Sequence, residues 1–184
     1  MIEVATTDLA GVKIVTPPRF QDARGFFSES WQAEKFRAAG IDVDFVQDNH
    51  SFSALAGTVR GLHFQSPPRA QAKLVRCTRG RLTDVAVDLR KSSPTFGRSV
   101  CVELSFENGK QLFIPEGFAH GFVTLVDETE ISYKCSDYFA PDCDRSLAFD
   151  DLDLNIDWGI ARDAAHLSEK DAKAPSLKEL DNPF

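Results

Sequence analysis

Two tyrosines and four histidines are the side chains of this sequence best suited to moving protons near neutral pH. Phenylalanine occurs 15 times and tyrosine only twice, so a phenolic hydroxyl is a rare choice in this chain. Tyr133 lies in a segment where Ile131, Tyr133 and Cys135 alternate with polar residues. This period of two is typical of a half-buried strand. The pattern predicts that Tyr133 points to the apolar side and so into the interior of the barrel.

Two of the histidines lie in segments that resemble the motifs of the cupin fold. The segment 115–122 has the Pro-x-Gly-x-x-His form of the second cupin motif, with His120 as its histidine. The first motif supplies His-x-His and then Glu, whereas this chain has His63, Phe64 and Gln65 with no glutamate close behind. A divalent ion normally takes three or more protein ligands. We therefore expect the barrel of a cupin without its metal.

Short alternating segments separated by turn residues occupy most of the chain. The strand candidates are 12–16, 25–29, 43–48, 58–65, 72–78, 84–89, 100–104, 111–114, 121–125 and 131–135. Many short strands with few helices are typical of a β-sandwich or barrel. The predicted fold class is all-β: a cupin-like jelly-roll (double-stranded β-helix) barrel with a few short peripheral helices.

Three patterns outside the strands give specific expectations. Asn108-Gly109 predicts a hairpin with a type I′ turn, because both residue types tolerate positive φ angles. A helix is predicted at 31–39, with Ser30 as its N-cap and Gly40 just beyond its end. The charged stretch 161–184 predicts short helical turns packed outside the sheet.

The composition argues against several classes of protein. Lys and Arg total 21 against 28 Asp and Glu, a net charge of −7, whereas proteins that bind nucleic acid polymers normally carry a basic excess. No apolar run is long enough for a membrane span, and the N-terminus lacks the features of a signal peptide. The four cysteines show no Cys-x-x-Cys spacing, so we expect reduced thiols in a cytoplasmic protein. The length of 184 residues suits one domain spanning 1–184.

A series of segments, in order along nearly the whole chain, resembles the dTDP-4-dehydrorhamnose 3,5-epimerase family. They are 22–27, 45–51, 59–65, 73–77, 84–90, 92–97, 114–122, 133–134 and 167–171. Each is short, but together they are highly specific. The resemblance implies conversion of dTDP-4-dehydro-6-deoxy-D-glucose to dTDP-4-dehydro-β-L-rhamnose in dTDP-L-rhamnose biosynthesis, with inversion at C3 and C5.

Such a reaction depends on the C4 ketone, which acidifies the protons of both neighbouring carbons. It needs a base on one face, a charge stabiliser at the ketone oxygen and an acid on the opposite face. It needs no redox cofactor and no metal, so we expect no cofactor. By the resemblance, His63 is the base and Asp171 the carboxylate that orients it, Lys73 lies at the ketone oxygen, and Tyr133 is the acid.

The resemblance also implies side chains that bind the nucleotide and the sugar. They are Arg24, Phe26, Glu29, Gln47, Asp48, Asn49, Arg60, Lys73, His120, Asp144 and Lys170. The cations among them suit the diphosphate, because a guanidinium donates paired hydrogen bonds to phosphate. Phe64 and Asp144 stand where the family often has Tyr and Glu. Family members are typically homodimers in which strands near 20–30 reach the neighbouring site, so we expect a homodimer.

Three other interpretations remain open from the sequence. Some relatives epimerise only C3 or only C5 of related dTDP-4-keto-6-deoxy sugars, and they can keep both His63 and Tyr133. A non-catalytic sugar-nucleotide-binding cupin module is a second alternative, against which the presence of base, acid and Lys73 together argues. A metal-dependent cupin dioxygenase or isomerase is a third, against which the missing ligands of the first motif argue.

Overall fold

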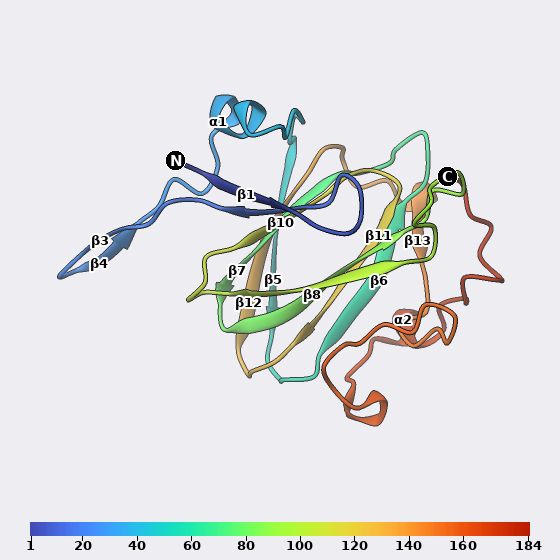
Figure 1. Ribbon diagram of the computed structural model, residues 1–184. Coiled ribbons are helices and arrows are strands. Elements are labelled where there is room, and N and C mark those ends of the chain that lie inside the picture. The colour runs from blue at the N-terminus through green and yellow to red at the C-terminus, as the bar shows by residue number, and fades with distance from the viewer.

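The computed structural model describes residues 1–184, and two antiparallel β-sheets dominate it (Figure 1). The six-stranded sheet has the order β1-β2-β10-β7-β12-β5, and the five-stranded sheet has the order β13-β6-β11-β8-β9. The strands of the two sheets are β1 (Glu3–Thr6), β2 (Lys13–Thr16), β5 (Gln47–Ser53), β6 (Val59–Gln65), β7 (Lys73–Arg79), β8 (Arg81–Asp88), β9 (Ser99–Ser105), β10 (Gln111–Ile114), β11 (Phe118–Thr124), β12 (Thr129–Cys135) and β13 (Asp144–Ser146).

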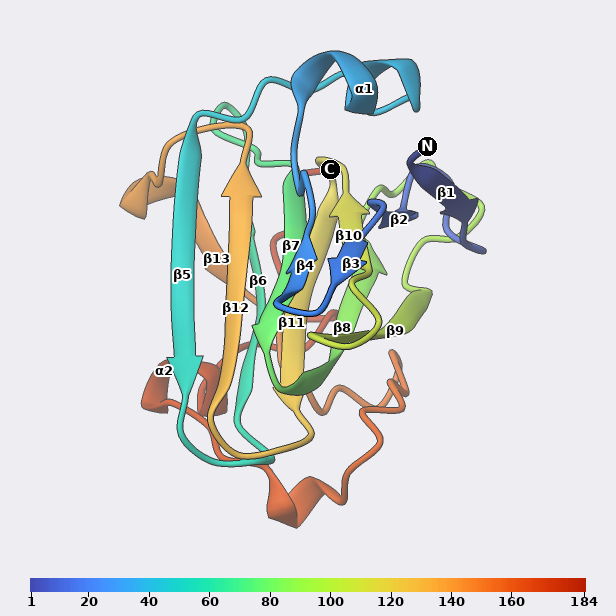
Figure 2. The same ribbon diagram turned by 90° about the vertical axis from the view of Figure 1, so that its left-hand side faces the viewer.

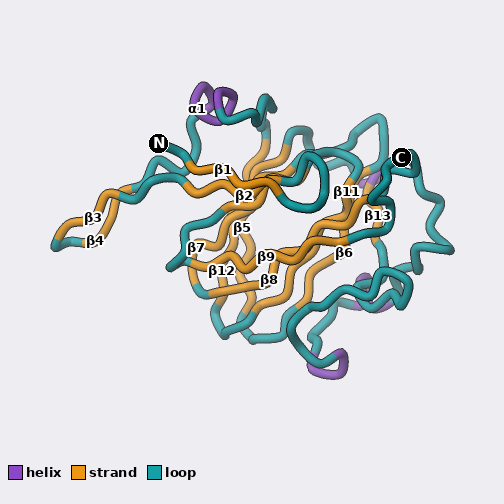
Figure 3. The backbone as a smooth tube through the Cα atoms, in the orientation of Figure 1, coloured by secondary structure: helices purple, strands orange, loops and turns teal.

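The helices are short and lie around the sheets (Figure 3). They are α1 (Ala33–Ala38), α2 (Glu169–Ala172) and the 3₁₀ turns η1 (Pro141–Cys143) and η2 (Arg162–Ala164). None of them has the length and apolar composition needed to cross a bilayer. The turns η2 and α2 confirm the prediction of short helical turns in the stretch 161–184.

The main core lies between the two sheets. Val75, Leu112 and Ile131 come from the six-stranded sheet, and they share one buried cluster with Leu104 and Phe122 of the five-stranded sheet. Alternation of apolar and polar residues sends one face of each strand into this core.

Strand β8 departs from the half-buried pattern that its alternation predicts. Its residues Val85 and Val87 are as buried as Ala86 between them, because they belong to a second cluster on the outer face of the sheet. Leu154 and Trp158, from the chain that follows β13, cover them there. Because this segment covers the outer face of the sheet, β8 is buried on both faces.

The Asn108-Gly109 turn does not form the predicted hairpin. It joins β9 to β10, which belong to different sheets and do not pair. Gly109 has a φ of 62°, but Asn108 is not among the residues with positive φ, so the turn is not type I′. The Asn108 side chain instead accepts hydrogen bonds from the backbone N–H groups of Ser105 (3.1 Å) and Lys110 (2.9 Å).

Helix α1 also begins later than predicted. Gln32 rather than Ser30 is the N-cap, and its side chain accepts a hydrogen bond from the backbone of Lys35 at 2.6 Å. Gly40 follows the helix with a φ of 79°, as expected. The predicted strand at 43–48 enters the sheet only at Gln47; Val43 and Phe45 before it pack against the cluster that contains Phe36 of α1.

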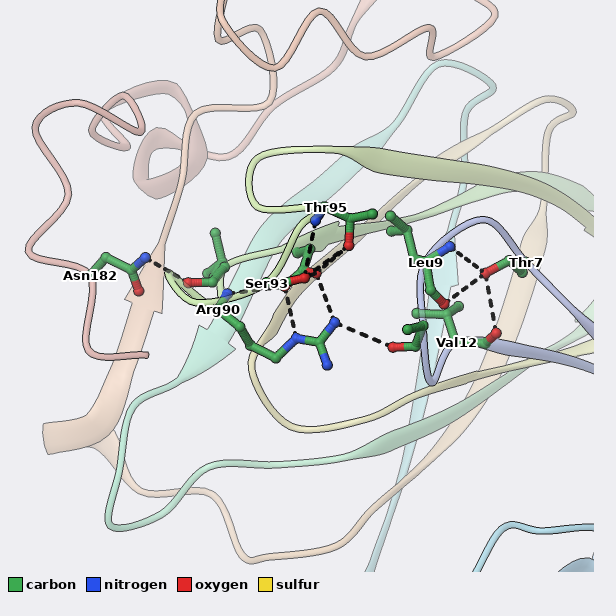
Figure 4. A network of polar contacts seen from close by, with 10 residues as sticks. Thr7, Leu9, Val12, Arg90, Ser93, Thr95 and Asn182 are labelled. Atoms are coloured by element: carbon green, nitrogen blue, oxygen red, sulfur yellow. Dashed lines mark hydrogen bonds and ion pairs between the residues drawn. The ribbon is translucent and has the colours of Figure 1, made fainter.

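A polar network fastens both ends of the chain to the end of β8 (Figure 4). Buried Asp88 accepts hydrogen bonds from Arg90 and from the hydroxyls of Ser93 (2.6 Å) and Thr95 (2.7 Å). Arg90 also donates to a carbonyl of the N-terminal loop, and Asn182 donates to the carbonyl beside Asp88 at 2.7 Å. Burial by itself raises the pKa of Asp88, but these donors more than offset it and hold the pKa well below its usual range.

A hairpin of β3 (Phe20–Asp22) and β4 (Gly25–Phe27) extends away from the two sheets (Figures 1 and 2). All six of its strand residues are exposed. The hairpin forms a sheet of its own and pairs with no strand of the body.

Candidate active site

The five-stranded sheet, the six-stranded sheet and the C-terminal segment line one cavity of about 500 Å³. Its lining is rich in titratable and hydroxyl side chains. The lining residues are Ser51, Thr58, Val59, Arg60, His63, Lys73, His120, Phe122, Tyr133, His166, Leu167, Ser168, Lys170 and Asp171. The cavity therefore brings together His63, Lys73, Tyr133 and Asp171 from four different elements.

His63 on β6 and Asp171 on α2 form a hydrogen-bonded pair across 108 residues of sequence. His63 Nε2 lies 2.6 Å from Asp171 Oδ1. The imidazole is 32% exposed toward the cavity, whereas the Asp171 side chain is 4% exposed. Burial raises the pKa of Asp171, but hydrogen bonds from His63, Ser168 and the backbone of Gly61 outweigh it and lower that pKa. Asp171 is thus held as a carboxylate that hydrogen-bonds the imidazole and can fix the orientation of its ring.

Two features of the chain place this pair. Ser168 is the N-cap of α2 and accepts a hydrogen bond from the backbone N–H of Asp171 at 3.1 Å. On β6, Gly61 has a φ of 121°, and a Cβ there would lie 2.6 Å from Cα of Gly121 on β11. Only glycine allows the backbones of β6 and β11 to approach so closely near His63.

A second pair lies next to the first, because His120 on β11 is directly opposite His63 on β6. His120 Nε2 lies 2.8 Å from Asp84 Oδ1, and both side chains are buried. Burial lowers the pKa of His120, and the attraction of Asp84 only partly opposes this. Asp84 Oδ2 has no hydrogen-bond partner.

Lys73 begins β7 and reaches into the cavity between the two sheets. It is buried, and its Nζ lies 3.5 Å from the backbone carbonyl of His63. Burial lowers the pKa of its ammonium group, while Cys135, Asp84 and Asp144 act in the opposite direction. An ammonium of lowered pKa is a stronger hydrogen-bond donor to an oxygen that gains negative charge.

Tyr133 on β12 faces the interior, as its alternation with Ile131 and Cys135 predicts. Burial raises the pKa of its hydroxyl, and nearby Asn49 and Arg60 oppose the shift. The hydroxyl is therefore protonated near neutral pH. It is available to give a proton, which is the state that an acid needs.

The edge strand β5 brings Gln47 and Asn49 beside Tyr133. Asn49 pairs with Tyr133 in the sheet, and Gln47 pairs with Cys135. The side chain of Gln47 donates to Asn49 at 3.1 Å, and Asn49 in turn donates to the sulfur of Cys135 at 3.6 Å. Neither Gln47 nor Asn49 lines the cavity itself; Asn49 is opposite Tyr133, which does, and Gln47 is connected to it through Asn49.

Two cations lie at the rim of the cavity. Arg60 is held by hydrogen bonds to the hydroxyl of Ser53 (3.2 Å) and the carbonyl of Phe52 (2.9 Å). Lys170 forms an ion pair with Asp144, so Asp144 contacts the cavity only through Lys170. Both cations are placed to meet a negatively charged part of a ligand.

Besides Gln47, Asn49 and Asp144, four more of the residues implied by the resemblance do not line this cavity. Arg24 is 89% exposed in the hairpin and pairs with Asp22 beside it, and Glu29 pairs with Lys35. The ring of Phe26 packs against Phe106 and against the guanidinium of Arg19. Asp48 alternates with Gln47 and Asn49, so it points to the outer face of the sheet, where it pairs with Lys134. A single copy of the chain therefore does not assemble the whole implied set.

Sequence reasoning missed several cavity residues, among them Ser51, Thr58, His166 and Ser168. A parallel bridge between Thr58 and His166 draws the C-terminal segment against the start of β6. The Ser-x-x-Asp spacing of Ser168 and Asp171 is the one local signal that marks part of this wall, because it is typical of a helix start. No group of three or more His, Cys, Asp or Glu side chains is arranged to hold a metal ion.

These features define a class: a cupin-like jelly roll whose cavity holds a histidine–aspartate pair, a buried lysine and a tyrosine, as in enzymes that move protons next to a carbonyl. The family model described as dTDP-4-dehydrorhamnose 3,5-epimerase matches residues 6–179, and the chain belongs to that family. A relative of that name from Sinorhizobium fredii is 53% identical over 176 residues, which cover 96% of this chain and 90% of the relative.

The solved structures agree with the fold and the family. The epimerase of Legionella pneumophila, described in complex with dTDP-4-keto-L-rhamnose, matches with a TM-score of 0.94 and 44% identity over 98% of this chain and 95% of that one. A 3′-monoepimerase from Streptomyces bikiniensis in complex with dTDP-quinovose matches with a TM-score of 0.85 and 35% identity over 94% and 86%. The predictions of family, of enzymatic class as an epimerase and of a cupin-like jelly roll are confirmed.

Proposed function

We propose that this chain, as one domain over 1–184, inverts C3 and C5 of dTDP-4-dehydro-6-deoxy-D-glucose to give dTDP-4-dehydro-β-L-rhamnose for dTDP-L-rhamnose biosynthesis. The observation that carries the proposal is the convergence of His63, Lys73 and Tyr133 on one cavity, with Asp171 behind the histidine. These side chains supply the base, the charge stabiliser and the acid that the reaction needs.

The proposed steps conserve protons and electrons. His63 takes the proton from the carbon next to the ketone, and the electron pair of the broken C–H bond forms an enolate whose oxygen accepts a hydrogen bond from Lys73. Tyr133 then gives its proton to the opposite face of that carbon, which inverts it. Exchange with solvent returns His63 and Tyr133 to their starting states before the second carbon reacts.

Substrate binding extends beyond the cavity of one copy. We assign the diphosphate to the rim cations Arg60 and Lys170, and the sugar side to His120, with Gln47, Asn49 and Asp144 supporting residues that line the cavity. Arg24, Phe26, Glu29 and Asp48 do not line the cavity of their own copy. In a homodimer the exposed β3–β4 hairpin would bring Arg24 to the cavity of the second copy. Light scattering that finds only monomers would contradict this proposal.

Proton NMR in deuterium oxide tests the reaction directly. The purified protein is mixed with dTDP-4-dehydro-6-deoxy-D-glucose without added metal or nicotinamide, and deuterium entry is followed at each carbon. We expect deuterium at both C3 and C5, and an L-rhamnose product after a partner reductase acts. Exchange at one carbon alone would assign the chain to the single epimerases, and exchange at neither would leave a sugar-nucleotide-binding module.

A further inference from the structure

The β3–β4 hairpin extends away from the body (Figure 1), yet three side chains hold it to the body at its base. The guanidinium carbon of Arg19, just before β3, lies 4.2 Å from the ring centre of Phe26 and 5.5 Å from that of Phe106. The two ring centres are 5.5 Å apart. Because Phe26 belongs to the hairpin and Phe106 to the turn between β9 and β10, the guanidinium joins the hairpin to the body.

The turn is shaped to receive this guanidinium. Arg19 Nη1 donates a hydrogen bond to the carbonyl of Glu107 at 2.9 Å. A Cβ on Gly109 would lie 2.8 Å from Arg19 Cζ, so a side chain there would require the guanidinium to move from its present position. A flat guanidinium can stack on aromatic rings and donate hydrogen bonds in its own plane at the same time, which a lysine cannot do.

The rest of the hairpin has no such support. Phe27 is 69% exposed, and the ion pair of Arg24 stays within the hairpin. An isolated two-stranded hairpin is marginally stable in water. The direction in which this hairpin leaves the body therefore depends on the contacts at its base.

We propose that Arg19, Phe26 and Phe106 are positioning residues: they form a clamp that presents Arg24 in one orientation to the diphosphate of a dTDP-sugar bound by a second copy of the chain. The inference rests on the proposed function, in which the hairpin serves a neighbouring site. In this proposal Phe26 holds the hairpin in place and does not bind the substrate. Breaking the clamp removes no group that touches the reacting carbons, but the hairpin must then be ordered when substrate binds, which weakens binding.

The test uses the full-length variant Phe106→Ala. We expect faster hydrogen–deuterium exchange in the backbone of residues 20–27, a KM for the dTDP-sugar raised between about 5-fold and 30-fold, and an unchanged kcat. Phe106→Tyr keeps the ring and should restore both the exchange rate and the KM. Phe96→Ala is the matched control, because Phe96 is 40% exposed on another loop and Phe106 is 43% exposed.

Arg24→Ala separates the clamp from the proposed function. If Arg24→Ala leaves the KM unchanged, the hairpin does not serve the site and the homodimer proposal fails. If Arg24→Ala raises the KM while Phe106→Ala changes neither the KM nor hydrogen exchange, the clamp is overturned and the proposed function stands. A lower kcat for Phe106→Ala at unchanged KM would likewise overturn the positioning role.

Discussion

Two histidine–aspartate pairs lie side by side in this protein, and they differ in how they are built. His63 and Asp171 come from β6 and from α2 near the C-terminus, and the histidine faces the cavity. His120 and Asp84 come from the neighbouring strands β11 and β8; His120 borders the cavity but is only 6% exposed, and Asp84 is fully buried. The contact is nearly the same in each pair, so the degree of exposure to the cavity, more than the pairing itself, distinguishes His63, the proposed base, from His120.

The charges around each pair reinforce this difference. In both pairs Nε2 faces the carboxylate, so in the neutral imidazole Nε2–H donates and Nδ1 keeps its lone pair. Burial lowers the pKa of His120, with nearby Lys73 and His63 adding to the effect, so His120 stays neutral. The lowered pKa of Asp171 keeps that residue ionised and ready to stabilise a protonated His63. This difference favours His63 over His120 as the group that takes the proton in the proposed reaction.

The largest effect expected is that of His63→Ala. Because a positioned general base contributes about 10²–10⁴-fold, deuterium entry at C3 and C5 should fall by about 10³-fold or more. The fold should survive, since the imidazole is partly exposed. His50→Ala is the matched control, because His50 lies outside the cavity on β5 and pairs with Glu130. Undiminished exchange in His63→Ala would show that another group is the base.

Tyr133→Phe should separate proton removal from inversion. The variant keeps His63 and Lys73, so deuterium still enters at the carbons next to the ketone. Product formation should fall by about 10²-fold or more, because no acid remains on the opposite face. NMR of exchange and a reductase-coupled assay of product measure the two steps separately. Epimerisation at the wild-type rate would make Tyr133 a core residue whose hydroxyl is only structural.

Asp171→Asn and Asp84→Asn compare the two pairs by the same change. Asp171→Asn removes the charge behind the base, so kcat should fall about 10- to 100-fold with the fold retained. Asp84→Asn changes a carboxylate that pairs with His120 and not with the proposed base, so kcat should fall less. Because Asp84 is buried, this variant should also change the midpoint of thermal unfolding. The two pairs would have equivalent roles if both variants lost kcat to the same extent.

The sequence predicted a feature correctly where the local pattern of apolar and polar residues agrees with the packing of the folded chain. Tyr133 faces inward as its alternation requires, and the turns of residues 161–184 lie outside the sheet. The pairing of His63 with Asp171 was implied by the resemblance alone, because a serine and an aspartate near a C-terminus are equally typical of a solvated turn. Contacts over 108 residues of sequence leave no local signal.

Errors occur where a distant segment decides the outcome. The period of two in β8 is genuine, but the chain after β13 covers the outer face and buries both sides. Asn108-Gly109 has the composition of a hairpin, but it connects two sheets and receives the guanidinium of Arg19. Neither the burial of both faces of β8 nor the connection between the two sheets can be predicted from the residues of the strand or the turn.

The smallest effect expected is the contribution of His120 to the pH dependence of the free energy of unfolding. The folded pKa of His120 lies below its usual value because the ring is buried, so the unfolded chain takes up a proton at higher pH than the folded one. This group therefore stabilises the fold above about pH 6.5, and its contribution is lost as the pH falls, by up to about 1.4 kcal/mol per pH unit. Asp171 behaves otherwise, since its lowered pKa affects stability only below about pH 4.

Denaturant unfolding between about pH 7.5 and pH 5.5 measures this slope. His120→Gln cannot titrate, so its free energy of unfolding should depend less steeply on pH than that of the wild type. His50→Gln, at an exposed position, should keep the wild-type slope. Equal slopes for His120→Gln and the wild type would mean that His120 is not held neutral, and the contrast between the two pairs would then rest on exposure alone.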